Sequence, residues 1–273
     1  MSDRRWQPRM GLGILLLANQ LFSQHHVIPT VTLLAVVGQT LLYMGIINPP
    51  WGRTEVCLSC ESILYFHDYR RLFLSAIEHS SDFHLYHNMA SLILKGQSLE
   101  RRYGTLKFLI LLLVFTVASS LTYVGLAFCA AKYFESSSYM KTCAIGFSGV
   151  LFALKVVTTY HSGSSYQSIQ GFSIPAKYAV WAELVLIHIL VPNASFIGHL
   201  AGILVGLAYV YGPLWYLVDG VCRMLNPDLP VLGGRGYNPT GRQSYTYTRT
   251  TLRESQQARG EGQSNYGWNY HQD

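Results

Sequence analysis

Long apolar runs alternate with shorter polar segments along the chain. A helix that crosses a bilayer needs about 20 predominantly apolar residues. Three runs meet that length with no acidic or basic side chain apart from one histidine: residues 27–47, 108–131 and 195–218. Three weaker runs contain several polar groups: residues 83–99, 143–160 and 173–191. We interpret all six as membrane-spanning helices, because the intervals would otherwise become long structureless loops.

The composition supports this interpretation. Hydrophobic residues make up 50% of the chain and charged residues only 12%, whereas soluble domains carry about 25% charged residues. We therefore predict an all-α polytopic membrane protein in contact with the lipid bilayer. The net charge of +6 is not gathered in a lysine-rich block with interleaved aromatic residues, so we expect no nucleic-acid partner.

The charges also orient the predicted helices. Basic residues gather on the side that also holds the N-terminus, as the positive-inside rule requires of a cytosolic side; they are Arg4, Arg5, Arg9, Arg101, Arg102, Lys107, Lys177 and Arg223. We expect a cytosolic amphipathic N-terminal segment over residues 1–26, a six-span domain over residues 27–222 and a cytosolic tail over residues 223–273. The tail is poor in aliphatic residues, a composition that predicts disorder.

Two features of the chain ends have more than one interpretation. Three arginines followed by a short apolar core near the N-terminus resemble a signal peptide, but no small-residue cleavage site separates that core from the next run. We therefore interpret the segment as uncleaved. The tail is either a plain solubilising segment or a segment that binds a partner, and the sequence favours neither.

Polar residues inside the apolar runs mark the candidate chemistry, because ionisable groups are costly in lipid. Ser148 stands between Gly146 and Gly149 at the start of an apolar run. His199 stands in the last run among glycines spaced four residues apart: Gly198, Gly202 and Gly206. Such glycines let two helix backbones approach closely, as a hydrogen bond between a reactive serine and a histidine requires. The alternative is that the glycines simply pack helices and the two polar side chains satisfy each other.

Further polar residues precede this pair along the chain. His84 and Asn88 are four residues apart and share one helix face, and both side chains are suitable donors to an oxyanion. His84 and His87 are an alternative metal pair, but no nearby carboxylate accompanies them, so we expect no metal and no cofactor. Cys57 and Cys60 form a CxxC, for which a redox pair, a disulfide and two unrelated thiols are all open.

Three short segments occur in a distinctive order: HLYHN at residues 84–88, GFSG at residues 146–149 and GHLAG at residues 198–202. With LERRYG at residues 99–104 and the six apolar runs, they resemble the rhomboid family of intramembrane serine proteases over about residues 70–215. The resemblance is greatest to the rhomboid domain-containing proteases of the endoplasmic reticulum. It implies a six-helix rhomboid fold in the endoplasmic-reticulum membrane with both termini in the cytosol.

The resemblance also implies roles for the matching residues. Ser148 corresponds to the nucleophile and His199 to its general base, without an acidic third member. His84 and Asn88 correspond to side chains that stabilise the oxyanion, and Gly146 to the glycine at which the active-site loop turns. Structural support is implied for three further residues: Phe152, which stacks on the histidine where the family often has tyrosine; Gly198, in place of the usual alanine; and Gly202, which allows close helix packing.

We therefore expect a serine endopeptidase that cleaves transmembrane helices of single-pass or polytopic membrane proteins, in protein quality control or regulated release. The alternative is a catalytically inactive derlin-type relative that binds membrane clients; such relatives lack the serine or the histidine, and both are present here. An α/β-hydrolase is disfavoured, because its elbow requires GxSxG and Val150 takes the last glycine position. Mammalian-type relatives engage ubiquitin and an AAA ATPase through acidic tail helices, but this tail has few acidic residues.

Overall fold

The computed structural model describes residues 11–24, 27–52, 55–162, 165–169, 171–191 and 194–227. Residues 1–10, which contain three of the basic residues used to orient the chain, lie outside the described residues. Residues 228–273, which form most of the predicted tail, also lie outside them. The predictions for these two segments stay predictions.

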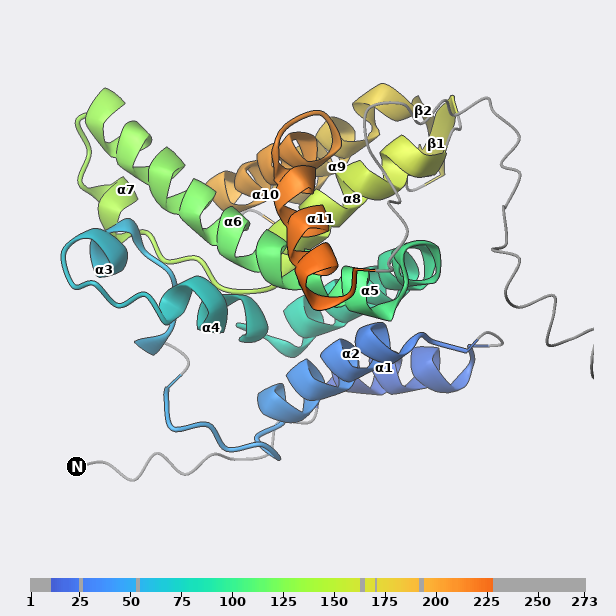
Figure 1. Cartoon of the computed structure of the whole chain (residues 1–273). Helices are drawn as coiled ribbons and strands as arrows, with labels where there is room; N and C mark the ends of the chain where they lie inside the picture. The colour runs from blue at the N-terminus through green and yellow to red at the C-terminus, as the bar shows by residue number, and fades with distance from the viewer. Residues whose placement is uncertain are drawn as a thin grey trace, which may run out of the picture. The chain divides into compact units, whose positions relative to one another are not determined.

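Helices of very different length make up most of the described chain, and one β-hairpin follows α8 (Figure 1). In chain order the elements are α1 (Leu12–Phe22), α2 (Thr30–Tyr43), α3 (Cys60–Leu64), α4 (Arg71–Ile77), α5 (Asp82–Tyr103), α6 (Thr105–Tyr133), α7 (Ser138–Lys141), α8 (Ser148–Ser162), β1 (Tyr166–Ile169), β2 (Phe172–Pro175), α9 (Ala176–Leu190), α10 (Phe196–Val210) and α11 (Leu214–Leu225).

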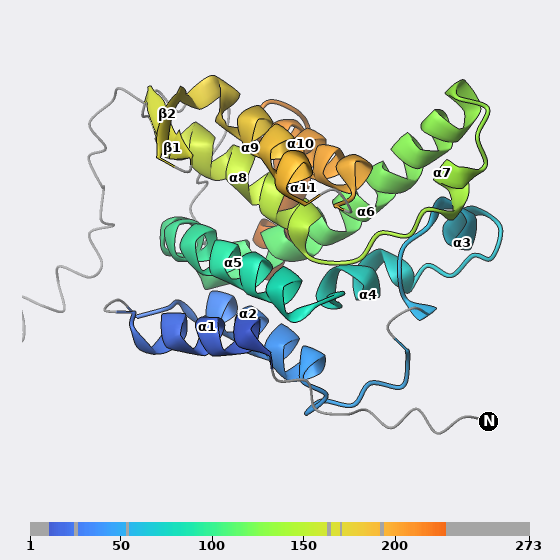
Figure 2. The ribbon, with the colours of Figure 1, turned by 180° about the vertical axis from the view of Figure 1, so that it is seen from behind.

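Four helices, α5, α6, α8 and α10, form the centre of the protein. Helix α8 contacts the other three and α9, and α10 also packs on α6. Large apolar side chains fill the space between these helices; examples that are fully buried are Leu92, Phe108, Phe115, Leu154 and Ile203. The short helices α3, α4 and α7 gather at one end of α6, where they contact it (Figure 2).

The outer faces of the helices are apolar as well. Side chains more than half exposed occur on four different helices, namely Leu34, Leu121, Val185 and Leu217. A helix that is apolar on its inner and its outer face is typical of a buried or membrane environment. The surface of the helices therefore suits lipid rather than water.

A buried carboxylate joins α2 to α5. Glu100 is 2% exposed and accepts hydrogen bonds from the backbone N–H groups of Val31 and Thr32, both at 2.8 Å, and from the Thr32 hydroxyl at 2.7 Å. The first N–H groups of a helix lack partners within the helix and attract negative charge. Pro29, which precedes α2, makes no side-chain cap. Glu100 therefore supplies the missing cap from a distant part of the sequence.

The start of α1 lies at the opposite end of α5 from this cap. The N–H of Gly13 donates to the carboxylate of Asp82 at 3.0 Å, whereas Arg101 donates to the carbonyl oxygen of Val27 at 2.7 Å. Helix α1 therefore packs along α5 (Figure 2), which α2 also contacts. The prediction for residues 1–26 is an amphipathic segment, whereas α1 carries apolar side chains on its buried and its exposed faces.

Three details differ from six continuous helices in an all-α fold. Strands β1 and β2 pair antiparallel, so the helix predicted from residue 173 begins only at Ala176, after Pro175. The predicted helix over residues 195–218 is two helices, α10 and α11, which are bent by 68°. Tyr211, Gly212 and Pro213 separate them, and proline disfavours helical backbone at the residue before it. Helix α11 continues to Leu225, past the predicted domain boundary at residue 222.

Helix length tests the prediction of six membrane spans only in part. Among the described residues, α6, with 29 residues, is the one single helix that is long and apolar enough to cross a membrane. Helices α10 and α11 meet the same criterion together as a bent pair. Each of the six predicted runs contains a helix, but six spanning helices are not established by length and composition.

Replacing Glu100 by glutamine should destabilise the protein, because a neutral amide has one acceptor oxygen where the carboxylate accepts from three donors. We expect the free energy of unfolding to fall by about 1–3 kcal/mol, measured as a lower Tm in detergent. Glu135→Gln removes the same charge from an exposed position and is the matched control. Equal Tm values for the two variants would contradict the capping role.

Candidate active site

Backbone hydrogen bonds hold the segment before α8 against the loop between α2 and α5. Leu58 and Ala144 exchange two N–H···O bonds of 2.8 Å, which form an isolated antiparallel bridge. The N–H of Gly146 donates to the carbonyl oxygen of Ser75, also at 2.8 Å. Ser148 follows as the first residue of α8. The position of Ser148 therefore depends on a loop that is distant in sequence.

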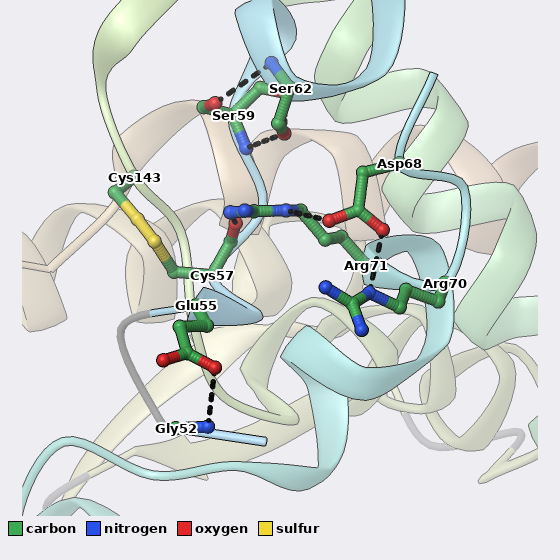
Figure 3. A network of polar contacts seen from close by, with 9 residues as sticks. All are labelled: Gly52, Glu55, Cys57, Ser59, Ser62, Asp68, Arg70, Arg71 and Cys143. Atoms are coloured by element: carbon green, nitrogen blue, oxygen red, sulfur yellow. Dashed lines mark hydrogen bonds and ion pairs between the residues drawn. A yellow bond between two sulfur atoms is a disulfide. The ribbon is translucent and has the colours of Figure 1, made fainter. Parts of the chain in front are cut away.

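A disulfide joins the same two segments covalently (Figure 3). It links Cys57 to Cys143, whose Cα atoms are 5.6 Å apart. This pairing differs from every interpretation of the CxxC as a self-contained pair. Cys60 is instead a free, buried thiol, and burial raises its pKa. The partner of Cys57 could not be found from the sequence, because 86 residues separate the two cysteines.

An arginine stabilises the loop around this disulfide (Figure 3). Arg71 donates to the carbonyl oxygen of Cys57 and to the carboxylate of Asp68, both at 2.8 Å. Arg70 donates to the other oxygen of Asp68 at 2.8 Å. Burial acts to raise the pKa of Asp68, but the hydrogen bonds and charges of the two arginines outweigh it, so this pKa is lowered. The loop that is bonded to the serine segment is therefore held in shape by its own hydrogen bonds and ion pairs.

Ser148 and His199 form a hydrogen-bonded pair. Nε2 of His199 lies 2.9 Å from Oγ of Ser148, although the residues are 51 positions apart. His199 is 4% exposed and lies in the first turn of α10. Ser195 caps this turn by accepting a hydrogen bond from the N–H of Gly198 at 3.1 Å. The distance and the partners are those of a nucleophile beside a general base.

The close approach of α8 and α10 requires glycine at their contact. A Cβ added to Gly202 would lie 2.0 Å from the backbone oxygen of Gly149. A Cβ added to Gly206 would lie 2.8 Å from the backbone oxygen of Ala153. Side chains at these positions would push the helices apart, so the spacing of glycines predicted from the sequence serves to bring Ser148 to His199.

Two rings lie beside the ring of His199. Phe152, one turn after Ser148 on α8, has its ring centroid 4.7 Å from that of His199, at an interplanar angle of 31°. This is the packing that the resemblance implied. His188 from α9 has its ring centroid 5.3 Å from that of His199, at 71°. Sequence reasoning assigned His188 no role at the site, because its place depends on how α9 packs against α10.

His84 lies against the segment that precedes Ser148. A Cβ added to Gly146 would lie 2.5 Å from Cε1 of the His84 ring and 2.7 Å from its Nε2. Gly146 also has a φ of +113°, which side chains rarely tolerate. The hydroxyl of Ser80 lies 2.9 Å from Nδ1 of His84, so the Nε2 edge of the ring faces the serine segment.

Asn88 lies one helical turn further along α5 and is 4% exposed. Its Nδ2 donates to the carbonyl oxygen of His84 at 2.7 Å, and its Oδ1 is buried without a hydrogen-bond partner in the described part of the chain. One of the two N–H donors of the Asn88 amide is therefore engaged within α5, and the other remains available to an oxyanion. The structure brings the ring of His84 to the Ser148 segment.

A cavity of about 50 Å³ lies beside Ser148, and its lining includes Ser75 and Ser119. Oγ of Ser119 is buried and has no hydrogen-bond partner among the residues described. A water molecule needs roughly 10–15 Å³ of such space and polar partners, so the cavity can hold water next to the serine. No group of three His, Cys, Asp or Glu side chains in the described ranges is arranged to hold a metal ion.

These observations define a helical protein with a lipid-compatible surface and a hydrogen-bonded pair of a half-buried serine and a buried histidine. The rhomboid domain family matches residues 67–216. Rhomboid-related protein 4 of Homo sapiens is 39% identical over 241 residues, which cover 86% of this chain and 75% of the relative. Rhomboid-like protein 14, mitochondrial, of Arabidopsis thaliana is 37% identical over 83% of this chain and 72% of the relative. The chain belongs to the rhomboid family and is a membrane protein.

A more distant relative has a name that states an activity. Rhomboid-type serine protease 2 of Debaryomyces hansenii is 30% identical over 157 residues, which cover 55% of this chain and 52% of the relative. The family match and the relative from Homo sapiens confirm the rhomboid family that was recognised from the three short motifs. The mostly helical architecture agrees with that family.

Removing the disulfide by Cys57→Ser or Cys143→Ser should loosen the segment that leads to Ser148. A native disulfide contributes about 2–4 kcal/mol, so we expect a lower Tm and faster hydrogen exchange over residues 143–147. Cys129→Ser removes an exposed free thiol and is the matched control. Exchange rates that match the control in both variants would show that the disulfide does not hold this segment.

Proposed function

We propose that the chain is an intramembrane serine endopeptidase that cleaves transmembrane helices of membrane-protein substrates. The observation that carries the proposal is the 2.9 Å contact between Oγ of the half-buried Ser148 and Nε2 of the buried His199 in a rhomboid-family chain. The name of the Debaryomyces hansenii relative supports the same activity. No cofactor takes part in the proposed reaction.

Acylation of the serine is the first half of the proposed reaction. Oγ of Ser148 attacks the carbonyl carbon of the scissile peptide bond as its proton passes to Nε2 of His199. The backbone N–H of Ser148, at the positive end of α8, and the side chains of His84 and Asn88 donate to the oxyanion. When the C–N bond breaks, the proton on Nε2 passes to the leaving amine.

Hydrolysis of the acyl-enzyme completes the proposed cycle. A water molecule from the cavity beside Ser148 gives a proton to Nε2 of His199 as its oxygen attacks the ester carbon. The Ser148 oxygen leaves and takes that proton back, so the enzyme returns to its starting state. The product is the carboxylic acid end of the cleaved substrate.

Substrates of this site must expose a peptide carbonyl inside a narrow space between helices. A peptide group in an intact helix has its carbonyl engaged in a hydrogen bond. We therefore propose membrane helices with small or helix-breaking residues near the cleavage point, from single-pass or polytopic proteins. Proteolysis in quality control or regulated release fits such substrates. Ubiquitin or AAA-ATPase partners are possible by resemblance, but the composition of the tail does not support them.

We place the enzyme in the endoplasmic-reticulum membrane, with the Arg101 end of the helices and the C-terminal tail in the cytosol. The disulfide between Cys57 and Cys143 supports an oxidising compartment at the opposite end, where the serine segment lies. The word mitochondrial belongs to the name of the Arabidopsis thaliana relative. If this protein lay in a mitochondrial membrane, the end that carries Ser148 would also face away from the cytosol. Cell fractionation therefore decides between the endoplasmic reticulum and the mitochondrion.

The test is labelling of the full chain in detergent with a serine-directed fluorophosphonate. We expect wild type to be labelled, Ser148→Ala to be unlabelled and His199→Ala to be labelled about 100-fold or more slowly, because a general base contributes roughly 10²–10⁴-fold. His87→Ala removes an exposed histidine from α5 and is the matched control. Folding of each variant is checked by its Tm.

Either result has a clear meaning. Labelling that depends on both Ser148 and His199 supports an activated serine and justifies a search for substrates. If folded wild type is labelled no faster than Ser148→Ala, the Ser–His pair is structural. The derlin-type alternative, in which the chain binds membrane clients without cleaving them, then replaces the protease.

A further inference from the structure

Two buried ring nitrogens near the Ser–His pair have no hydrogen-bond partner among the residues described. They are Nδ1 of His199 and Nε2 of His188. A buried polar atom without a partner is costly, and such atoms in native structures call for an explanation. The two rings are neighbours, with centroids 5.3 Å apart and planes at 71°. The two unpaired atoms therefore belong to adjacent side chains.

The hydrogen bonds that the rings already make determine the role of each unpaired atom. Nδ1 of His188 lies 2.8 Å from the carbonyl oxygen of Leu184. A carbonyl oxygen can only accept, so this Nδ1 carries the proton, and Nε2 of a neutral His188 is an acceptor. Nε2 of His199 must accept the proton of Ser148 for the serine to be activated, so Nδ1 of a neutral His199 is a donor.

The unpaired atoms are thus a complementary donor and acceptor. The N–H at Nδ1 of His199 needs an acceptor, and Nε2 of His188 is one. The rings are held close by their surroundings: Phe152 packs on His199, and the ring of Phe196 lies 5.1 Å from that of His188. Hydrogen bonds of catalytic groups are often long in structures without substrate and tighten in the complex.

We propose that His188 is a positioning residue that accepts a hydrogen bond from Nδ1 of His199 during the reaction. This inference rests on the proposed function and extends the Ser–His pair to a Ser148–His199–His188 array. His188 fixes the tautomer of His199 in which Nε2 is free to take the serine proton. It has the place that a buried aspartate has in a Ser–His–Asp triad, where it orients the histidine without taking its proton.

The proton balance of the reaction is unchanged by this role. The proton of Ser148 moves to Nε2 of His199 as Oγ bonds to the substrate carbon, and the imidazolium then carries protons on both nitrogens. The proton at Nδ1 stays on His199, and this N–H donates a hydrogen bond to Nε2 of His188. The proton at Nε2 leaves with the amine of the product, which restores the neutral tautomer.

Two substitutions separate hydrogen bonding from packing. His188→Phe keeps a ring of similar shape beside Phe196 but has no acceptor. His188→Gln places an amide oxygen near the position of Nε2 and can accept from His199. His87→Phe, at an exposed histidine on α5, is the matched control. The measurement is the second-order rate of fluorophosphonate labelling of Ser148 in the full chain, with the Tm of every variant alongside.

We expect His188→Phe to slow labelling by about 10- to 100-fold, by analogy with the loss found when the hydrogen-bond partner that orients a metal-ligating histidine is removed. We expect His188→Gln to recover most of the rate and His87→Phe to match wild type. If His188→Phe is labelled at the wild-type rate, or if His188→Gln is folded but as slow as His188→Phe, the inference is overturned.

The experiment also separates this inference from the proposed function. Labelling of wild type that needs Ser148 and His199 but is unaffected by His188→Phe removes only the positioning role. The absence of Ser148-dependent labelling in wild type removes the protease itself. If His188→Phe loses both labelling and its folding transition, the rate of His188→Gln decides, because its amide side chain fills a volume similar to that of histidine.

Discussion

The contact between the backbones of α8 and α10 is the constraint on which the site depends. With the place for a Cβ on Gly202 only 2.0 Å from the backbone oxygen of Gly149, the helices are as close as backbones allow. Serine has a short side chain, so Oγ of Ser148 at the start of α8 reaches Nε2 of His199 only when the two helix backbones are this close. Helix packing and the candidate chemistry therefore have a single cause.

A second constraint acts at the other end of the serine segment. The bridge between Leu58 and Ala144 and the disulfide between Cys57 and Cys143 hold the residues before α8 to the α2–α5 loop. Packing against α10 fixes the helix that follows. Ser148 sits between a covalently tethered segment and a closely packed helix, so its position is determined from both directions, as preorganised catalysis requires.

The parts of the site that the sequence predicted are those that local spacing encodes. Glycines four residues apart around His199 and the glycines beside Ser148 indicate a close helix contact from the sequence alone. The cap that Glu100 provides and the partner of Cys57 join residues more than 65 positions apart, and no local pattern contains that information. The bend before α11 had a local signal, the Gly212–Pro213 pair, but the apolar run across it favoured one helix.

No acidic side chain in the described part of the chain is hydrogen-bonded to His199, and the surroundings of the site give a physical reason. A carboxylate buried among apolar helices loses its hydration, and the loss often exceeds the gain from pairing with a histidine. Neutral groups avoid that cost. Phe152 restrains the ring of His199 by contact, and the ring of His188, which can accept a hydrogen bond without carrying a charge, lies beside it. In the proposed mechanism, Ser148 is therefore activated by rings alone, which the backbones of α8 and α10 hold in place.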